Sequence, residues 1–99
     1  MGYDRFRILD KDLVKDINFL INNETYMIAR ADCILFTRRL LSRKVVILGI
    51  EGFFFDGENI TPDMQCIFEF SNVKDDSDVI GGAEVAATTN SHFLEFTLK

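Results

Sequence analysis

The chain has 99 residues and a formal net charge of −5, and 47% of its residues are hydrophobic. This length predicts a single domain over residues 1–99 with one modest core, and the apolar content, with ten Phe, excludes an intrinsically disordered protein. No apolar run reaches the roughly 18 residues of a membrane-spanning helix, and the N-terminus has no apolar signal-peptide core, so we expect a cytoplasmic protein.

Charge is unevenly distributed along the chain. Residues 25–50 hold five bases against one acid, whereas residues 51–99 hold ten acids against two bases. The acidic half would repel a phosphate backbone and attract a basic protein surface. We therefore expect a protein partner, and neither nucleic acid nor a membrane.

The N-terminal quarter is expected to form one amphipathic helix. Residues 2–8 could be an arm or an edge strand, and Asp10 is a plausible N-cap for a helix over about 10–22, stopped by Asn22-Asn23. The apolar residues of this segment fall at helical spacing: Leu13, Val14, Ile17, Leu20 and Ile21.

A second helix is expected over 33–43, with Asp32 as its N-cap. Residues 24–31, just before it, fit either a helix or a short strand. The C-terminal end of the helix is basic, which complements the helix dipole, and four bases without interleaved aromatics are weak evidence for nucleic-acid binding. These bases are Arg38, Arg39, Arg43 and Lys44.

Residues 45–57, VVILGIEGFFFDG, are expected to form the central strand. Their β-branched and aromatic composition is typical of a buried strand. Apolar residues at both odd and even positions at its beginning favour cover on both faces, as when helices pack on a central strand.

Glycines interrupt this strand, and Gly49 and Gly52 indicate a bulge or a close approach of another backbone. Glu51 lies between them and either points to solvent or is presented to a partner. Asp56-Gly57 suits a type I′ hairpin turn, and 58–60 could be a short return strand.

Another helix start follows at Thr61-Pro62-Asp63, with an N-cap Thr, Pro at the first helical position and Asp in the first turn. The residues expected to pack inward from this short helix are Met64, Ile67 and Phe68, with Phe70 as a further candidate.

The C-terminal third is expected to end in a helix and a strand. Residues 71–78 are polar and should be an exposed connection, with Ser77 or Asp78 capping a segment over 79–89 that Ala favours as helix and Gly81-Gly82 weakens. Residues 92–98 alternate, which predicts a half-buried strand paired with the central one. Together these elements predict an α/β fold, a central β-sheet with two or more helices packed on it.

No catalytic or ligand-binding signature accompanies this pattern. His92 is the only histidine, and Cys33 and Cys66 lack the spacing of a metal site. Each cysteine lies among apolar neighbours, so we expect two unpaired, buried thiols, and a Cys–His pair with His92 is an alternative that no local sequence feature supports. A phosphate-binding loop is also missing. We expect no catalytic residue, no cofactor, no metal ion and no enzymatic activity.

Residues 40–57, LLSRKVVILGIEGFFFDG, resemble small bacterial toxin-immunity proteins of the contact-dependent growth inhibition and nuclease-colicin types. The spacing of residues 50–71 and the terminal FLEFTLK resemble the same group. This resemblance implies a non-catalytic protein that binds the C-terminal domain of a cognate toxin, with a basic nuclease expected from the acidity of the chain. Two alternatives remain: an inhibitor of another defence or nucleic-acid-processing system, or a small enzyme or accessory subunit.

Charge and strand geometry, rather than the resemblance, predict where a partner would bind. Acids at the end of the central strand, in the next segment and in the exposed connection could form one surface with an aromatic anchor at its centre. The alternative is that these acids are ordinary solvated surface and that the Phe residues belong to the core. The predicted partner-binding residues are Glu51, Phe53, Phe55, Asp56, Glu58, Asp63, Asp75, Asp76 and Asp78.

Overall fold

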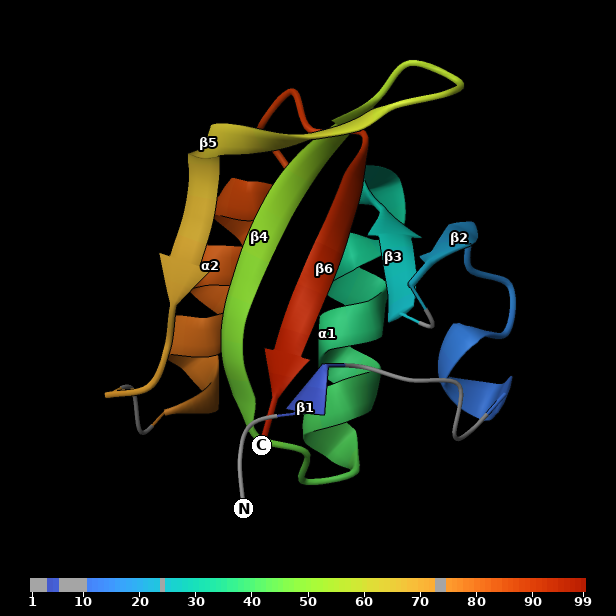
Figure 1. Ribbon diagram of the computed structural model, residues 1–99. Helices are drawn as coiled ribbons and strands as arrows, with labels where there is room; N and C mark the ends of the chain where they lie inside the picture. The colour runs from blue at the N-terminus through green and yellow to red at the C-terminus, as the bar shows by residue number, and fades with distance from the viewer. Residues whose placement is uncertain (1–3, 6–10, 24, 73–74) are drawn as a thin grey trace.

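The strands of the protein form one antiparallel sheet (Figure 1). The computed structural model describes residues 4–5, 11–23, 25–72 and 75–99. The strands are β1 (Asp4–Arg5), β2 (Phe19–Asn22), β3 (Thr25–Ala29), β4 (Ile47–Phe55), β5 (Ile60–Glu69) and β6 (Phe93–Leu98). Their order is β2-β3-β6-β4-β5, and β1 pairs with β6 on the edge that β6 also shares with β3. The predicted pairing of the terminal strand with the glycine-containing strand is confirmed.

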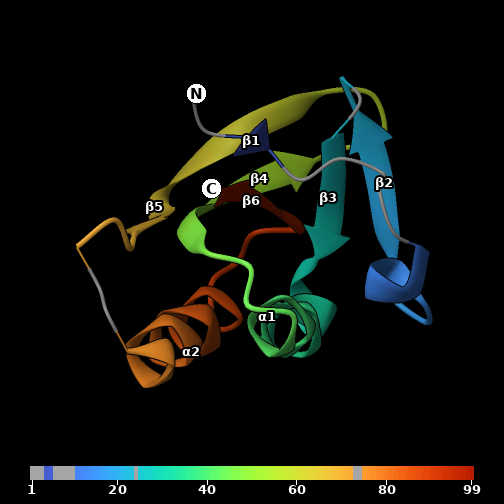
Figure 2. The same cartoon turned by 90° about the horizontal axis from the view of Figure 1, so that it is seen from below.

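Two α-helices pack on the sheet, as the predicted fold class requires. They are α1 (Cys33–Ser42) and α2 (Asp76–Ala86), and shorter 3-10 turns are η1 (Lys11–Val14) and η2 (Arg30–Asp32). Figure 2 shows α1 and α2 side by side on the same face. The expectation that helices would cover both faces of β4 is therefore wrong for the described residues. Within those residues no helix is long and apolar enough to cross a bilayer.

The core lies between this face and the helices. Alternation along β6 directs Leu94, Phe96 and Leu98 into it, as predicted, and the Phe96 ring meets Phe36 of α1 edge-on at a centroid distance of 4.9 Å. Cys33 and Cys66 are buried in the same cluster as unpaired thiols, as expected. Burial raises the pKa of the Cys33 thiol to about 12 because it disfavours the thiolate.

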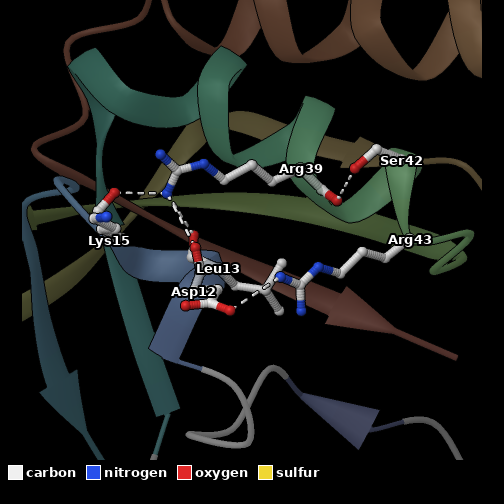
Figure 3. A network of polar contacts seen from close by, with 6 residues as sticks. All are labelled: Asp12, Leu13, Lys15, Arg39, Ser42 and Arg43. Atoms are coloured by element: carbon white, nitrogen blue, oxygen red, sulfur yellow. Dashed lines mark hydrogen bonds and ion pairs between the residues drawn. The ribbon is translucent and has the colours of Figure 1, made fainter.

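The helix predicted over 10–22 is wrong. Its proposed cap, Asp10, lies outside the described residues, and the segment divides into η1 and the strand β2. The Arg39 guanidinium explains the break, because its Nη1 donates to the carbonyl oxygens of Leu13 at 3.1 Å and Lys15 at 2.6 Å (Figure 3). A longer helix would need those oxygens for its own N–H groups. Asp16 then takes a φ of 61°, outside the right-handed helical region.

The helix predicted from Thr61 is also wrong, because residues Ile60–Glu69 form β5. Pro62 is compatible with this strand, since β5 is at the edge of the sheet and Pro lacks only one N–H. The Asp63 carboxylate does accept a local N–H, from Gln65 at 3.0 Å, but at a corner in a strand. Met64 and Ile67, expected in the core, are 75% and 53% exposed. Phe68 and Phe70 do pack against the core.

The remaining predicted segments are close to the structure. The helix predicted over 33–43 is α1, and residues 24–31 contain the strand β3. The segment predicted over 79–89 overlaps α2, but α2 begins at Asp76 with Asp75 at its N-cap position, so the predicted cap at Ser77 or Asp78 is wrong and the predicted connection over 71–78 ends earlier. Of residues 2–8, positions 4–5 form β1 and the others lie outside the described residues, as do positions 73–74 of the predicted connection. Gly82 in α2 makes room for Phe70, since a Cβ there would lie 2.5 Å from that ring.

Candidate functional site

Aromatic side chains gather where β4 ends, on the sheet face away from the helices. Ile50 and Gly52 pair with the core residues Phe96 and Leu94, so the alternation of the strand turns Phe53 and Phe55 to the opposite face. Phe53 pairs with Phe93 of β6, and the rings of Phe55 and Phe93 meet edge-on at 6.0 Å. All three rings are half-buried, so part of each remains accessible to a partner.

His92 holds this end of β4 in place. Its Nδ1 accepts the Phe55 N–H at 2.8 Å, and its own backbone N–H donates to the Phe53 oxygen at 2.9 Å. An Nδ1 that accepts a hydrogen bond carries no proton, so the other ring nitrogen is protonated in the neutral side chain. The Phe54 ring, on the helix side, meets the imidazole edge-on at 5.8 Å. His92 therefore has a positional role, which fixes the backbone beneath the exposed rings.

Acidic side chains follow these residues along the chain, in the loop between β4 and β5. The Asp56 carboxylate accepts the N–H groups of Asn59 at 2.7 Å and Glu58 at 2.9 Å. These bonds, that of Asn59 first, lower the pKa of Asp56 and keep it ionised. Within this loop Gly57 alone has a positive φ, so the predicted type I′ turn, which needs two such residues, is wrong. Asp56 and Glu58 are both exposed.

Phe53, Phe55, Phe93, Asp56 and Glu58 are called the hairpin surface below. Four of them were among the predicted partner-binding residues. Phe93 was not, although the alternation over 92–98 places it opposite Leu94. The missing information was the register between β4 and β6, which brings Phe93 beside Phe53 and Phe55.

Asp63, another predicted site residue, does not reach the surface. Its side chain is buried, and Oδ2 accepts the Ser91 hydroxyl at 2.6 Å. The pair lies under Gly52, where a Cβ would collide with the Ser91 Oγ and lie 2.7 Å from the Cys66 Cβ. The β4–β5 register shifts between Glu51 and Gly52, which confirms the bulge predicted at Gly52, and the atoms that a Cβ there would meet belong to side chains rather than to another backbone.

The acids of the α2 segment are far from the hairpin surface. Asp75 and Asp76 border a hollow with Lys44 and Val45, just before β4 begins, whereas Asp56 follows the last residue of β4. A nine-residue strand separates the two groups, a length of roughly 30 Å. Figure 1 shows the β4–β5 loop and the beginning of α2 at opposite ends of the molecule. Asp76 and Asp78 lie in the first turn of α2, where carboxylates interact favourably with the positive end of the helix dipole.

Glu51 lies midway along β4, exposed on the same face as Phe53. It borders a shallow groove of about 290 Å³, with Gly49 beside it on β4 and Ile67 and Glu69 on β5. The structure therefore places Phe53, Phe55, Asp56 and Glu58 at one end of the sheet, with Glu51 midway along β4 on the same face as the two Phe side chains. It buries Asp63 and places Asp75, Asp76 and Asp78 at the other end.

Comparison of the chain with protein-family models, with curated proteins and with solved structures found no match.

Proposed function

We propose that this chain is an immunity protein that binds the C-terminal domain of a cognate bacterial toxin, a basic nuclease, in the cytoplasm and neutralises it without catalysis. One observation carries the proposal. The hairpin surface combines three accessible aromatic rings with two exposed carboxylates at one end of a sheet. That combination suits recognition of a protein surface that is both basic and partly apolar.

The aromatic rings would supply most of the binding energy. Binding energy concentrates in a few aromatic or Arg residues near the centre of an interface. The backbone under Phe53 and Phe55 is held by the two hydrogen bonds to His92, so little order has to be gained on binding. These rings are therefore pre-organised anchors.

The carboxylates would supply speed and selectivity. The net charge of −5 and the ionised Asp56 produce a negative field, and a nuclease carries Lys and Arg where it binds phosphate. Attraction between opposite fields can raise association rates to roughly 10⁸–10⁹ M⁻¹s⁻¹ at low salt. Fast capture suits an inhibitor of a lethal enzyme, and carboxylates bound at the phosphate site would block the substrate.

The proposal is tested by neutralisation in cells. The gene for this chain should lie directly downstream of a large toxin gene, and its product, co-expressed with that toxin's C-terminal domain, should restore growth. Growth arrest despite soluble expression of both proteins contradicts the proposal.

Paired variants test the surface. Phe55→Ala should weaken binding by about 2 kcal/mol if the ring is an anchor. Leu35→Ala, which truncates an exposed side chain of α1, is the matched control and should leave binding unchanged. Equal affinities of the two variants would place the interface elsewhere.

A further inference from the structure

The outer edge of β5 is an unpaired strand edge in the described part of the chain. β5 ends the strand order and pairs only with β4 there, and Figure 1 shows it as the outermost strand on its side. The Phe70 N–H donates to the Leu48 oxygen at 2.8 Å, toward β4. Because antiparallel ladders alternate, the backbone N–H and C=O groups of Glu69 and Ile67 point outward.

Features that prevent another strand from pairing with β5 are present along only part of its outer edge. Pro62 and the corner at residues 64–66 interrupt its first half, and both features discourage an added strand. The second part, residues 67–69, pairs regularly with β4 and contains neither Lys nor Arg. Its Ile67 side chain is 53% exposed. This stretch therefore offers outward hydrogen-bonding groups beside an exposed apolar side chain.

The charges next to the edge favour a basic occupant. Glu69 follows Ile67 on the same face, Glu51 pairs with Ile67 from β4, and both carboxylates border the groove beside this stretch. A second copy of the chain would bring a second acidic stretch beside the first, and like charges on neighbouring strands are destabilising. Two molecules of net charge −5 also repel at longer range. A strand with a Lys or Arg at this position would instead be attracted.

We propose that the edge of β5 over residues 67–69 receives an extended segment of a protein partner, which adds a strand to the sheet. The segment places an apolar side chain against Ile67 and a Lys or Arg beside Glu69, within reach of Glu51. Main-chain hydrogen bonds give such an addition its affinity, and the side chains give it selectivity. The inference rests on the proposed function only for its partner, a basic protein.

A peptide tests the edge without the toxin. Amide hydrogen exchange of the isotope-labelled protein is measured by NMR with an excess of a short acetylated, amidated peptide that alternates lysine and valine. Exchange at the Ile67 and Glu69 amides should slow by about tenfold, because added-strand hydrogen bonds protect them. The same peptide with glutamate in place of lysine should give no protection.

Two variants of Ile67 distinguish the backbone contribution to peptide binding from the side-chain contribution. Ile67→Pro removes an outward N–H and should abolish the peptide effect, whereas Ile67→Ala keeps that N–H and should retain protection at Glu69. Where Ile67→Pro does not fold, Glu69→Lys is the second variant. It should weaken binding of the lysine peptide and strengthen binding of the glutamate peptide. No protection at Ile67 and Glu69, or equal protection by both peptides, overturns the inference.

A third outcome concerns the protein by itself. A dimer in the absence of peptide, with Ile67 and Glu69 already protected, would assign the edge to a second copy and overturn the inference. If the chain restores growth but the peptide does not bind, the proposed function stands and only the proposed strand addition at the β5 edge is refuted. If growth is not restored but the lysine peptide protects the Ile67 and Glu69 amides, the strand addition stands and the proposed function is refuted.

Discussion

The Ser91 hydroxyl donates a hydrogen bond of 2.6 Å to Oδ2 of Asp63, and this buried pair joins the segment just before β6 to the corner of β5. Oδ1 of the same carboxylate accepts the Gln65 N–H, so both oxygens are used. Gly52 provides the space in which the pair lies. Asp63, which the sequence predicted in the first turn of a helix and at a partner-binding surface, is therefore a structural residue.

Loss of the Ser91 hydroxyl should destabilise the protein. Ser91→Ala leaves the buried Asp63 carboxylate without one donor, and we expect the free energy of unfolding in urea to fall by about 1–3 kcal/mol. Ser77→Ala removes an exposed hydroxyl from α2 and is the control, with a change within about 0.5 kcal/mol. Equal stabilities of the two variants would mean that the buried pair contributes nothing.

Two glycines should respond to Ala with opposite signs. Gly52→Ala places a Cβ against the Ser91 Oγ and the Cys66 Cβ, so the free energy of unfolding should fall by about 1–3 kcal/mol. Gly81→Ala meets no atom within 4 Å and lies inside α2, so helix propensity should raise stability by about 0.5–1 kcal/mol. Thermal unfolding measures both, and a stabilising Gly52→Ala would contradict the packing described.

Alkaline pH should destabilise the fold through Cys33. The pKa of its thiol rises from 9.0 to about 12 because the side chain is buried. Above about pH 9 the unfolded chain loses this proton while the folded chain keeps it, so the free energy of unfolding falls as pH rises toward 12. From about pH 8 to about pH 10 the loss should be about 1.4 kcal/mol.

Comparison with Cys33→Ala isolates this thiol, because the other titrating groups are the same in both proteins. The variant should lose less stability over that pH interval than the parent. Identical pH slopes in the two proteins would show that the folded thiol ionises as readily as the unfolded one.

Charge reversal should affect partner association at one end of the molecule only. Glu58→Lys changes the exposed loop of the hairpin surface and should slow association with a basic partner by several-fold, up to about tenfold at low salt, with a weaker salt dependence. Asp76→Lys makes the same change of charge at the beginning of α2 and is the matched control. Equal slowing by both variants would attribute the effect to net charge rather than to the hairpin surface.

Arg39 and Arg38 should differ although they are neighbours on α1. Arg39 donates to carbonyl oxygens of the η1 segment, so Arg39→Gln should speed amide exchange in residues 11–17 by about tenfold or more. Arg38 is exposed, and Arg38→Gln should leave those amides unchanged. Unaltered exchange in the Arg39 variant would show that η1 is held by its apolar contacts alone.

The sequence by itself determined those elements in which the spacing of apolar residues agrees with the face that the fold buries. The helix at 33–43 and the strand at 92–98 bury the faces that their spacing predicts, and Gly52 marks the bulge expected of it. The two thiols are buried among apolar neighbours, as their local sequence indicated. In each case the local pattern and the tertiary packing favour the same conformation.

Only the tertiary structure decided the segments at 10–22 and 61–70. Their local signals favour helix, but Arg39, distant in sequence, takes carbonyl oxygens that a longer first helix would use. Pairing of Ile60–Glu69 with β4 likewise outweighs the Thr-Pro-Asp start, because a whole ladder of backbone bonds competes with a few tenths of a kcal/mol per residue of propensity.

The candidate surface shows the same division. Sequence spacing could nominate acids and aromatics, but their assembly depends on strand register and on the direction in which α2 returns along the sheet. Register brings Phe93 to Phe53 and Phe55, and the path of α2 carries Asp75, Asp76 and Asp78 to the other end. A residue type determines what chemistry is available, whereas distance between residues far apart in sequence is set only when the chain folds.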